Sequence, residues 1–206
     1  ERALLAGGEG EASARAGGPG DATALAMRVV VAAAELLGAA RLVDIASAHI
    51  DGCLYHGDGG VEFAERLVAG EGRVRVPTTL NVGALDLLHP DRVRGGTHHA
   101  AMARRQMEAY LALGCEPTWT CAPYQAGHRP GLGEQVAWGE SNAVAFANSV
   151  LGARTERYGD FLDACCALTA RAPLHGLHLA ANRVATVVVD ASGVPDALKR
   201  RDVFYP

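Results

Sequence analysis

The sequence reads P-T-W-T-C-A-P-Y-Q at residues 117–125 and, after a short loop, G-E-Q-V-A-W-G-E-S-N-A-V-A-F-A-N-S-V-L-G-A-R-T at residues 133–155. The loop, residues 126–133, holds three glycines and one proline, so it cannot continue a regular element. Glu140, Ser141 and Asn142 then open an Ala/Val-rich segment of helical length. Serine or asparagine at a helix start can cap free N–H groups, and this end of a helix attracts anions.

Cys121 lies in the first of these two motifs, among hydroxyl-bearing residues. A cysteine that can form a thiolate and a helix start that can bind an anion are therefore separated by a bent loop. This arrangement is typical of an active site. The alternative is a buried cysteine beside an ordinary capped helix, and the local sequence leaves it open.

The composition is that of a globular protein. The 206 residues are 49% hydrophobic and 20% charged, which fits one domain or a large piece of one. The net charge of -4 gives no sign of a nucleic-acid-binding surface. The chain starts with Glu1 rather than Met and stops at residues 204–206 without a closing element, which indicates a fragment.

The expected compartment is the cytoplasm. Five cysteines form an odd set without a regular disulfide framework, which favours a reducing compartment. The N-terminus has no signal-peptide pattern, and the longest apolar segment, residues 22–37, is interrupted by Arg28 and Glu35. We therefore expect no membrane-spanning segment.

Apolar spacing predicts an α/β fold, in which helices alternate with short strands. The expected helices cover residues 22–37, 61–69, 101–113 and 161–170, with Gly38 and Gly114 as stops. The expected strands cover residues 42–45, 73–76, 177–179 and 186–189, the first and last of them buried. The Gly/Ala-rich residues 4–21 are expected to be a loop of limited order.

A second informative motif, S-A-H-I-D-G-C-L-Y-H-G-D-G-G, covers residues 47–60. We expect it to be a loop at the carboxyl end of strand 42–45, where open α/β folds bind ligands. His49 and Asp51 are two residues apart, so on an extended chain both point to one side. The motif predicts a substrate or metal loop, and a polar turn around a buried histidine is the alternative.

The motif T-T-L-N, residues 78–81, is expected directly after strand 73–76, again at the ligand-binding end. A turn that caps the next segment is the alternative. The adjacent His98 and His99 diverge on any regular element, so we expect solvated or capping roles. Structural packing is expected for the three other cysteines, Cys115, Cys165 and Cys166.

Several motifs together resemble the aconitase X family. They are H-I-D-G-C-L-Y-H-G (49–57), V-P-T-T-L-N (76–81), P-T-W-T-C-A-P-Y (117–124), E-S-N-A-V-A-F-A-N-S-V-L-G-A-R-T (140–155), G-L-H-L (176–179) and N-R (182–183). The resemblance extends from the first helix to the C-terminus and is specific, because the motifs follow one another in the family's order.

The resemblance implies a hydro-lyase that removes water from a small hydroxy acid with the help of iron. The histidine–aspartate–cysteine motif resembles the cis-3-hydroxy-L-proline dehydratases, whose product is Δ1-pyrroline-2-carboxylate, whereas another branch acts on phosphomevalonate. The fold implied is an aconitase-like α/β large domain that works with a smaller swivelling domain.

The chain departs from the family in extent. The large domain of the family continues beyond D-V-F-Y-P (202–206), and the swivelling domain is absent, so residues 1–206 are interpreted as the N-terminal part of the catalytic domain. The missing parts are expected to supply more cluster ligands and a catalytic base, either as the remainder of the chain or as a small subunit. The segment 13–20 is longer than the family pattern.

The resemblance also assigns roles to residues, as hypotheses. Cys121 is the candidate ligand of an iron–sulfur cluster or a mononuclear iron. The candidate catalytic residues are His49, Asp51, Glu140 and Ser141, with His49 or Glu140 moving the proton. The candidate substrate-binding residues are Cys53, Tyr55, Thr78, Thr79, Asn81, Asn142 and Arg154, the last as a two-pronged partner of a carboxylate.

Two other classes of protein remain open from the sequence. One is a mononuclear metal hydrolase that uses His49, Asp51 and His56 and is indifferent to Cys121. The other is a catalytically silent partial domain that needs a partner chain to complete its site.

Overall fold

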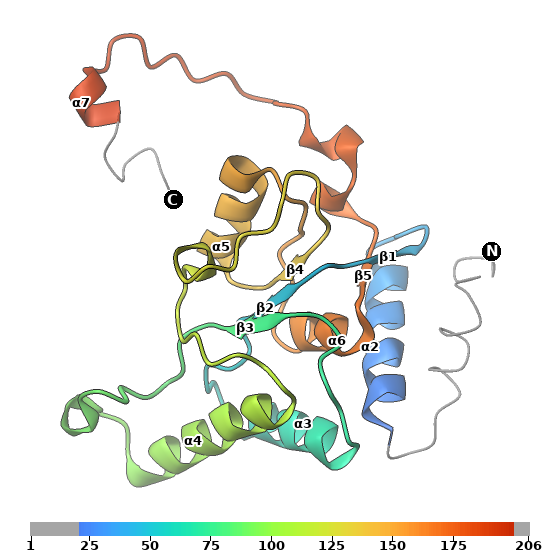
Figure 1. Ribbon diagram of the computed structural model, residues 1–206, viewed down its shortest axis with the longest axis vertical. Helices are drawn as coiled ribbons and strands as arrows, with labels where there is room; N and C mark the ends of the chain where they lie inside the picture. Colours follow the sequence, from blue (N-terminus) through green and yellow to red (C-terminus); the bar gives the residue numbers. More distant parts are fainter. Residues whose placement is uncertain (1–20, 200–206) are drawn as a thin grey trace.

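A computed structural model describes residues 21–199. Its centre is a parallel sheet of three short strands in the order β3-β2-β4, formed by Thr78–Leu80, Ala48–Ile50 and Ala137–Trp138. A second sheet pairs β1, Leu42–Asp44, with β5, Arg171–Pro173, in antiparallel orientation. Helices pack around both sheets, so the expected α/β fold is confirmed (Figure 1).

The described helices are α2 (Ala22–Leu36), α3 (Asp58–Ala69), α4 (Thr97–Ala112), α5 (Ser141–Phe146), α6 (Leu162–Thr169) and α7 (Asp196–Lys199). The side chain of Asp21 caps α2 by accepting hydrogen bonds from the Thr23 and Ala24 amides. Gly38 and Gly114 follow α2 and α4 with φ of 65° and 95°, a backbone conformation that glycine adopts without strain, so both expected stops are confirmed.

The two faces of the central sheet pack against different clusters. Successive side chains of a strand point to opposite faces, so Ala48 and Ile50 of β2 face the main core, together with Leu80 of β3. His49 points to the other face, where Trp138 of β4 belongs to a smaller apolar cluster formed with residues that follow Cys121 and with α5. The central sheet is therefore packed between two apolar clusters.

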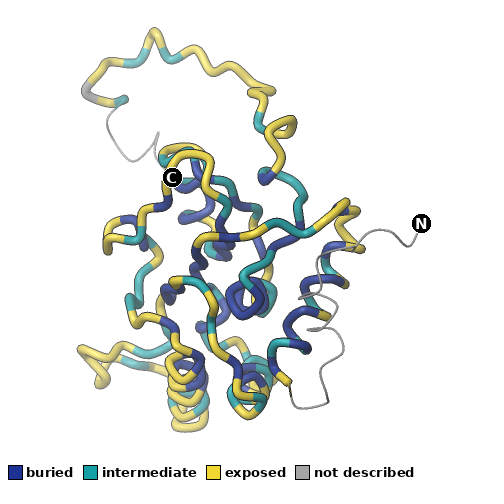
Figure 2. Tube along the Cα trace, turned by 45° about the vertical axis from the view of Figure 1, so that its right-hand side comes forward, coloured by how far each residue is buried: buried dark blue, intermediate teal, exposed yellow. Residues whose placement is uncertain are grey.

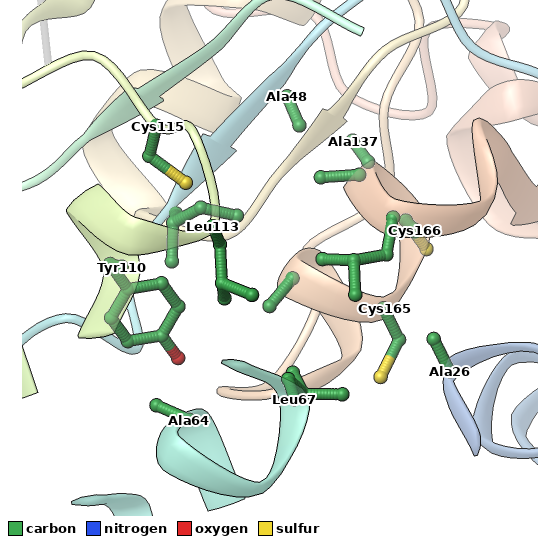
Figure 3. Close-up of a cluster of buried hydrophobic side chains, with 14 of the residues drawn as sticks. Ala26, Ala48, Ala64, Leu67, Tyr110, Leu113, Cys115, Ala137, Cys165 and Cys166 are labelled. Carbon is green, nitrogen blue, oxygen red and sulfur yellow. The ribbon is translucent and has the colours of Figure 1, made fainter. Parts of the chain in front are cut away.

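The main core holds four of the five cysteines, namely Cys53, Cys115, Cys165 and Cys166. Cys115, Cys165 and Cys166 are buried among Leu67, Tyr110 and Leu113 (Figure 3). Burial raises the pKa of each of these thiols, to about 12 for Cys115. They are neutral packing groups, as the sequence indicated.

Two of the expected strands are wrong, and a third is less buried than expected. Residues 73–76 are not a strand, and T-T-L-N itself provides β3, because the amide of Ala48 bonds to the Pro77 carbonyl and pairing with β2 begins at Thr78. Residues 42–44 form a strand, but it is half-exposed rather than buried. Residues 177–179 lie mostly in a 3-10 turn, Gly176–His178.

The expected buried strand at 186–189 is also wrong. Val187, Val188 and Val189 are 74%, 92% and 77% exposed, and no strand forms there, because this stretch has no partner strand among the described residues. Figures 1 and 2 show the segment after the Ala180–Arg183 turn running away from the body of the molecule as an exposed arm.

Some expectations fall on residues that the structure does not describe. The loop assigned to residues 4–21 lies outside the described residues except for Asp21, and the segments 13–20 and 202–206 lie outside them entirely. Between residues 21 and 199, none of the helices combines the length and the apolar character that crossing a membrane requires.

Candidate active site

The carboxyl ends of β2, β3 and β4 bring three polar side chains to one edge of the sheet. Asp51 follows β2, Asn81 follows β3 and Glu140 lies two residues after β4. The Asn81 Nδ2 donates a hydrogen bond of 2.5 Å to Asp51 Oδ1. These residues come from segments 30 positions or more apart, and parallel pairing of the strands is what assembles them.

Cys121 reaches the same edge because the segment before it runs beside β3. The Thr118 hydroxyl donates to the Leu80 carbonyl at 2.8 Å and accepts from the Leu80 amide at 3.1 Å. Cys121 is the one exposed cysteine among the five. Its pKa is raised, first by partial burial and then by the negative charges of Glu140 and Asp51, so both carboxylates lie near the thiol.

The start of α5 forms the next wall. Glu140, and not Ser141 or Asn142, caps the helix by accepting from the Ala143 amide at 2.7 Å, which corrects the expected cap. Its carboxylate therefore occupies the helix end that was expected to attract an anion. Ser141 Oγ lies 3.3 Å from Glu140 Oε1, and the Asn142 Nδ2 donates to the Tyr124 hydroxyl at 3.2 Å and to the Cys121 carbonyl at 3.5 Å.

Asp163 of α6 holds the backbone of Asp51 by a hydrogen bond. The sequence patterns did not single out this residue. It is fully buried in the first turn of α6, and its Oδ2 accepts from the Asp51 amide at 2.7 Å. Burial raises its pKa to about 7. Gly139 permits this approach, since a Cβ there would lie 2.7 Å from Asp163 Oδ2. The single acid in the apolar segment L-D-A-C-C-A-L-T was the available signal.

His49 lies in strand β2 and not in a loop, which corrects the expectation for residues 47–60. It is fully buried, and its Nδ1 is 2.9 Å from the hydroxyl of Thr79, its partner in register on β3. Burial, with a smaller effect of His128, lowers its pKa to about 3, so its ring is neutral.

His128 was missed as well. Its Nδ1 lies 2.7 Å from the Thr79 hydroxyl, although it belongs to the glycine-rich loop that the sequence marked only as irregular. The distance of 49 residues between them in sequence leaves no local pattern from which this contact could be found.

The other candidate residues make hydrogen bonds within their own local structure. The Cys53 thiol is fully buried and donates to the Asn81 carbonyl at 3.2 Å, and the Thr78 hydroxyl donates to the Val76 carbonyl at 2.8 Å. The Tyr55 hydroxyl donates to Asp58 at 2.7 Å on the exposed start of α3. The backbone of Arg154 pairs with Glu134 and Val136, away from the Asp51–Asn81 pair.

The metal site of the alternative hydrolase is not formed. His49 is buried within the sheet, whereas His56 is exposed and lines a separate surface pocket with Gln106 and Phe161. Within residues 21–199, no three histidine, cysteine, aspartate or glutamate side chains lie close enough together to hold a metal ion. The described residues therefore do not complete a set of metal ligands around Cys121.

The chain belongs to the aconitase X family. The family model described as "Aconitase X first domain" matches residues 6–181, which include every residue of the sheet edge described above. The expected family is thus confirmed, and the identity of the fold follows from a solved structure. The crystal structure of Thermococcus kodakaraensis aconitase X in its holo-form superposes with a TM-score of 0.77 at 38% identity, over 87% of this chain and 45% of that chain.

Two relatives carry the name cis-3-hydroxy-L-proline dehydratase. The protein of Pseudomonas aeruginosa is 49% identical over 100% of this chain and 33% of its own length, and that of Hypocrea jecorina is 45% identical over 92% and 32%. The phosphomevalonate dehydratase large subunit of Thermococcus kodakarensis is 40% identical over 85% of this chain and 44% of its own. The chain spans about a third of the length of the relatives it matches at the highest identity.

Proposed function

We propose that this chain is the N-terminal part of a hydro-lyase that removes water from a small hydroxy acid, and that the substrate is cis-3-hydroxy-L-proline. The reaction would give Δ1-pyrroline-2-carboxylate after tautomerisation of the first enamine. Identity of 49% and 45% to two proteins of that name, against 40% to a phosphomevalonate dehydratase large subunit, supports this choice of branch.

The observation that carries the proposal is the sheet edge itself. A dehydration next to a carboxylate needs a base at the α-carbon, polarisation of the leaving hydroxyl and donors that hold the carboxylate. The edge gathers two carboxylates, Asp51 and Glu140, with a thiol, Cys121, and the amide of Asn81. This set has the acid–base and donor groups for such a reaction, and a hydrolase built on His49 and His56 has no comparable support.

Of the two residues proposed to move the proton, His49 and Glu140, Glu140 is the better candidate for the base. His49 has a fully buried ring whose pKa is lowered to about 3, so it is a weaker base than an ordinary histidine and is enclosed by its neighbours. Glu140 is partly exposed next to Cys121. The Asn81 amide fixes one oxygen of Asp51, and Ser141 Oγ lies beside Glu140, so both carboxylates are oriented by the chain's own residues.

The cofactor we propose is an iron–sulfur cluster or a mononuclear iron, with Cys121 as one ligand. When bound, such a centre polarises a leaving hydroxyl as a Lewis acid. The remaining ligands would come from outside the described residues, because the described ones do not complete a set. We therefore also propose that the site works together with the remainder of a longer protein or with a small swivelling-domain subunit.

A chimaera tests the activity. Residues 1–206 replace the matching third of the Pseudomonas aeruginosa relative, and the purified protein is supplied with iron and sulfide without oxygen. Incubation with cis-3-hydroxy-L-proline is expected to give the cyclic imine, with phosphomevalonate as a negative control. A folded chimaera that forms no imine, while the unmodified relative does, would overturn the proposal.

The chain on its own serves as the comparison. Because the chain spans about a third of its relatives, we expect it to be folded and inactive by itself. Imine formation by the isolated chain would show that no further part is needed.

A further inference from the structure

One hydroxyl joins two histidines on the face of the sheet opposite the main core. Thr79 Oγ1 lies 2.9 Å from Nδ1 of His49 and 2.7 Å from Nδ1 of His128. His49 and Thr79 face each other in register on β2 and β3, whereas His128 belongs to the loop that covers them. The three side chains form a continuous hydrogen-bonded chain between sheet and loop.

This geometry restricts the protonation of both rings. A threonine hydroxyl has one hydrogen, so it can donate to only one of the two Nδ1 atoms and must accept from the other. The ring that accepts carries its hydrogen on Nε2, and the ring that donates carries it on Nδ1. Burial lowers the pKa of both histidines, which keeps each ring in a singly protonated, neutral form.

Among residues 21–199, Thr79 is the one hydrogen-bond partner of both rings. The Nε2 atoms of His49 and His128 are buried and have no hydrogen-bond partner among the described residues. Both rings also contact the fully buried Trp138, with ring centroids 5.8 Å and 5.3 Å apart, which restricts their rotation. Between residues 21 and 199, no second hydrogen bond therefore competes with Thr79 for either ring.

The Thr79–His128 hydrogen bond also anchors residues 118–128, the segment that carries Cys121. Before Cys121, the Thr118 hydroxyl bonds to both backbone groups of Leu80 on β3. After it, His128 bonds to Thr79, one residue earlier on the same strand, and the His128 amide donates to the Pro123 carbonyl at 3.0 Å. The segment is therefore anchored to β3 on both sides of Cys121.

We propose that His49, Thr79 and His128 are positioning residues that hold the loop over β3 and so fix Cys121 at the carboxyl end of the sheet, with the two imidazoles locked as opposite neutral tautomers. The functional importance of positioning Cys121 at the carboxyl end of the sheet rests on the proposed function. The lock itself is a property of this chain and is tested without turnover.

The first measurement is the tautomeric state of the two rings in the chain labelled with ¹⁵N. Long-range ¹H–¹⁵N spectra are expected to show one of the two rings protonated at Nδ1 and the other at Nε2. Thr79→Val should abolish this pairing and Thr79→Ser should restore it. Finding both rings in the same tautomer, or both doubly protonated at neutral pH, would overturn the proposal.

The second measurement is the rate at which iodoacetamide alkylates Cys121, the exposed cysteine. Thr79→Val releases one anchor of the loop, so we expect the rate to change by about tenfold, and Thr79→Ser to return it to the parent value. Thr78→Val is the matched control. It removes the hydroxyl of the adjacent residue, which donates to the Val76 carbonyl and not to either histidine. An unchanged rate in Thr79→Val, or an equal change in Thr78→Val, would contradict the positioning role.

Neither measurement depends on dehydration. If the tautomer and alkylation measurements contradict the positioning role, the proposed dehydratase activity is unaffected. If the chimaera forms no imine, the positioning role is unaffected, so the two proposals can be rejected separately.

Discussion

Asp163 shows how one buried residue shapes the candidate site. Its carboxyl group is fully enclosed, yet it accepts hydrogen bonds from the Asp51 and Ala164 amides. These bonds favour the charged form, but burial outweighs them and raises the pKa from 3.8 to about 7. Burying the Asp163 carboxyl group is unfavourable, but the buried group holds the Asp51 backbone at the end of β2.

This raised pKa predicts a pH dependence of stability. As the pH rises from about 4, the unfolded chain loses the Asp163 proton first, while the folded protein retains it up to about pH 7. The free energy of unfolding should therefore receive a contribution that falls with rising pH in that window, by at most about 1.4 kcal/mol per pH unit.

Asp163→Asn removes this titration. We expect the variant to lack the falling contribution between about pH 4 and pH 7, as measured by denaturant unfolding of both proteins at each pH. The buried histidines have lowered pKa values and act in the opposite direction, and comparing variant with parent cancels them. Parallel stability curves for the two proteins would show that Asp163 does not titrate in this range.

At the scale of elements, the helices were predictable and the short strands were not. Residues 61–69 and 101–113 carry periodic apolar residues over several turns, and α3 and α4 confirm them to within a few residues. Each strand of the central sheet has at most three residues, so its existence depends on its neighbours. The valines at 186–189 have strong β propensity but find no partner among the described residues, and they remain exposed.

The candidate site divides in the same way. Asp51, Asn81, Cys121 and Glu140 all stand in polar motifs that can be recognised in the sequence. The burial of His49 depends on strand pairing that follows no local pattern. Asp163 and His128 depend on contacts 112 and 49 residues away in sequence, so only the folded chain shows them.

Contact between β4 and α6 makes a prediction about Gly139. A Cβ there would lie 2.7 Å from Asp163 Oδ2 and 3.1 Å from the Cβ of Asp51, and both neighbours are held in place. Gly139→Ala should therefore lower the free energy of unfolding by about 1–3 kcal/mol in denaturant titrations.

Gly59→Ala is the control for this prediction. A Cβ at Gly59 meets nothing within 4 Å, and the residue lies in the first turn of α3. Its effect on the free energy of unfolding should stay within about 0.5 kcal/mol. Equal effects of the two substitutions would contradict the close approach at Gly139.

At the scale of the whole molecule, the exposed arm that follows Arg183 carries apolar side chains that no described part of the chain covers. The family model ends at residue 181, and Val187, Val188 and Val189 lie beyond it with at least 74% of each exposed. Consecutive exposed valines are unusual on a protein surface. The relatives named cis-3-hydroxy-L-proline dehydratase are about three times as long as this chain, so we expect the further residues of such a protein to cover this stretch.

Val188→Asp tests that expectation. In the isolated chain, a residue 92% exposed should tolerate the change within about 0.5 kcal/mol of unfolding free energy. In the chimaera, burial of the introduced carboxylate should destabilise the protein by about 1–3 kcal/mol. A neutral effect in both proteins, seen in thermal or denaturant unfolding, would show that the arm stays exposed.

The most direct test of the central claim compares the chimaera with its Cys121→Ala variant. Bound iron and imine formation from cis-3-hydroxy-L-proline are measured on the same preparations, after circular dichroism has shown that both are folded. If the edge formed by β3, β2 and β4 is the dehydratase site, the parent chimaera binds iron and forms the imine, and Cys121→Ala loses both. Retention of iron and turnover by Cys121→Ala would contradict the account.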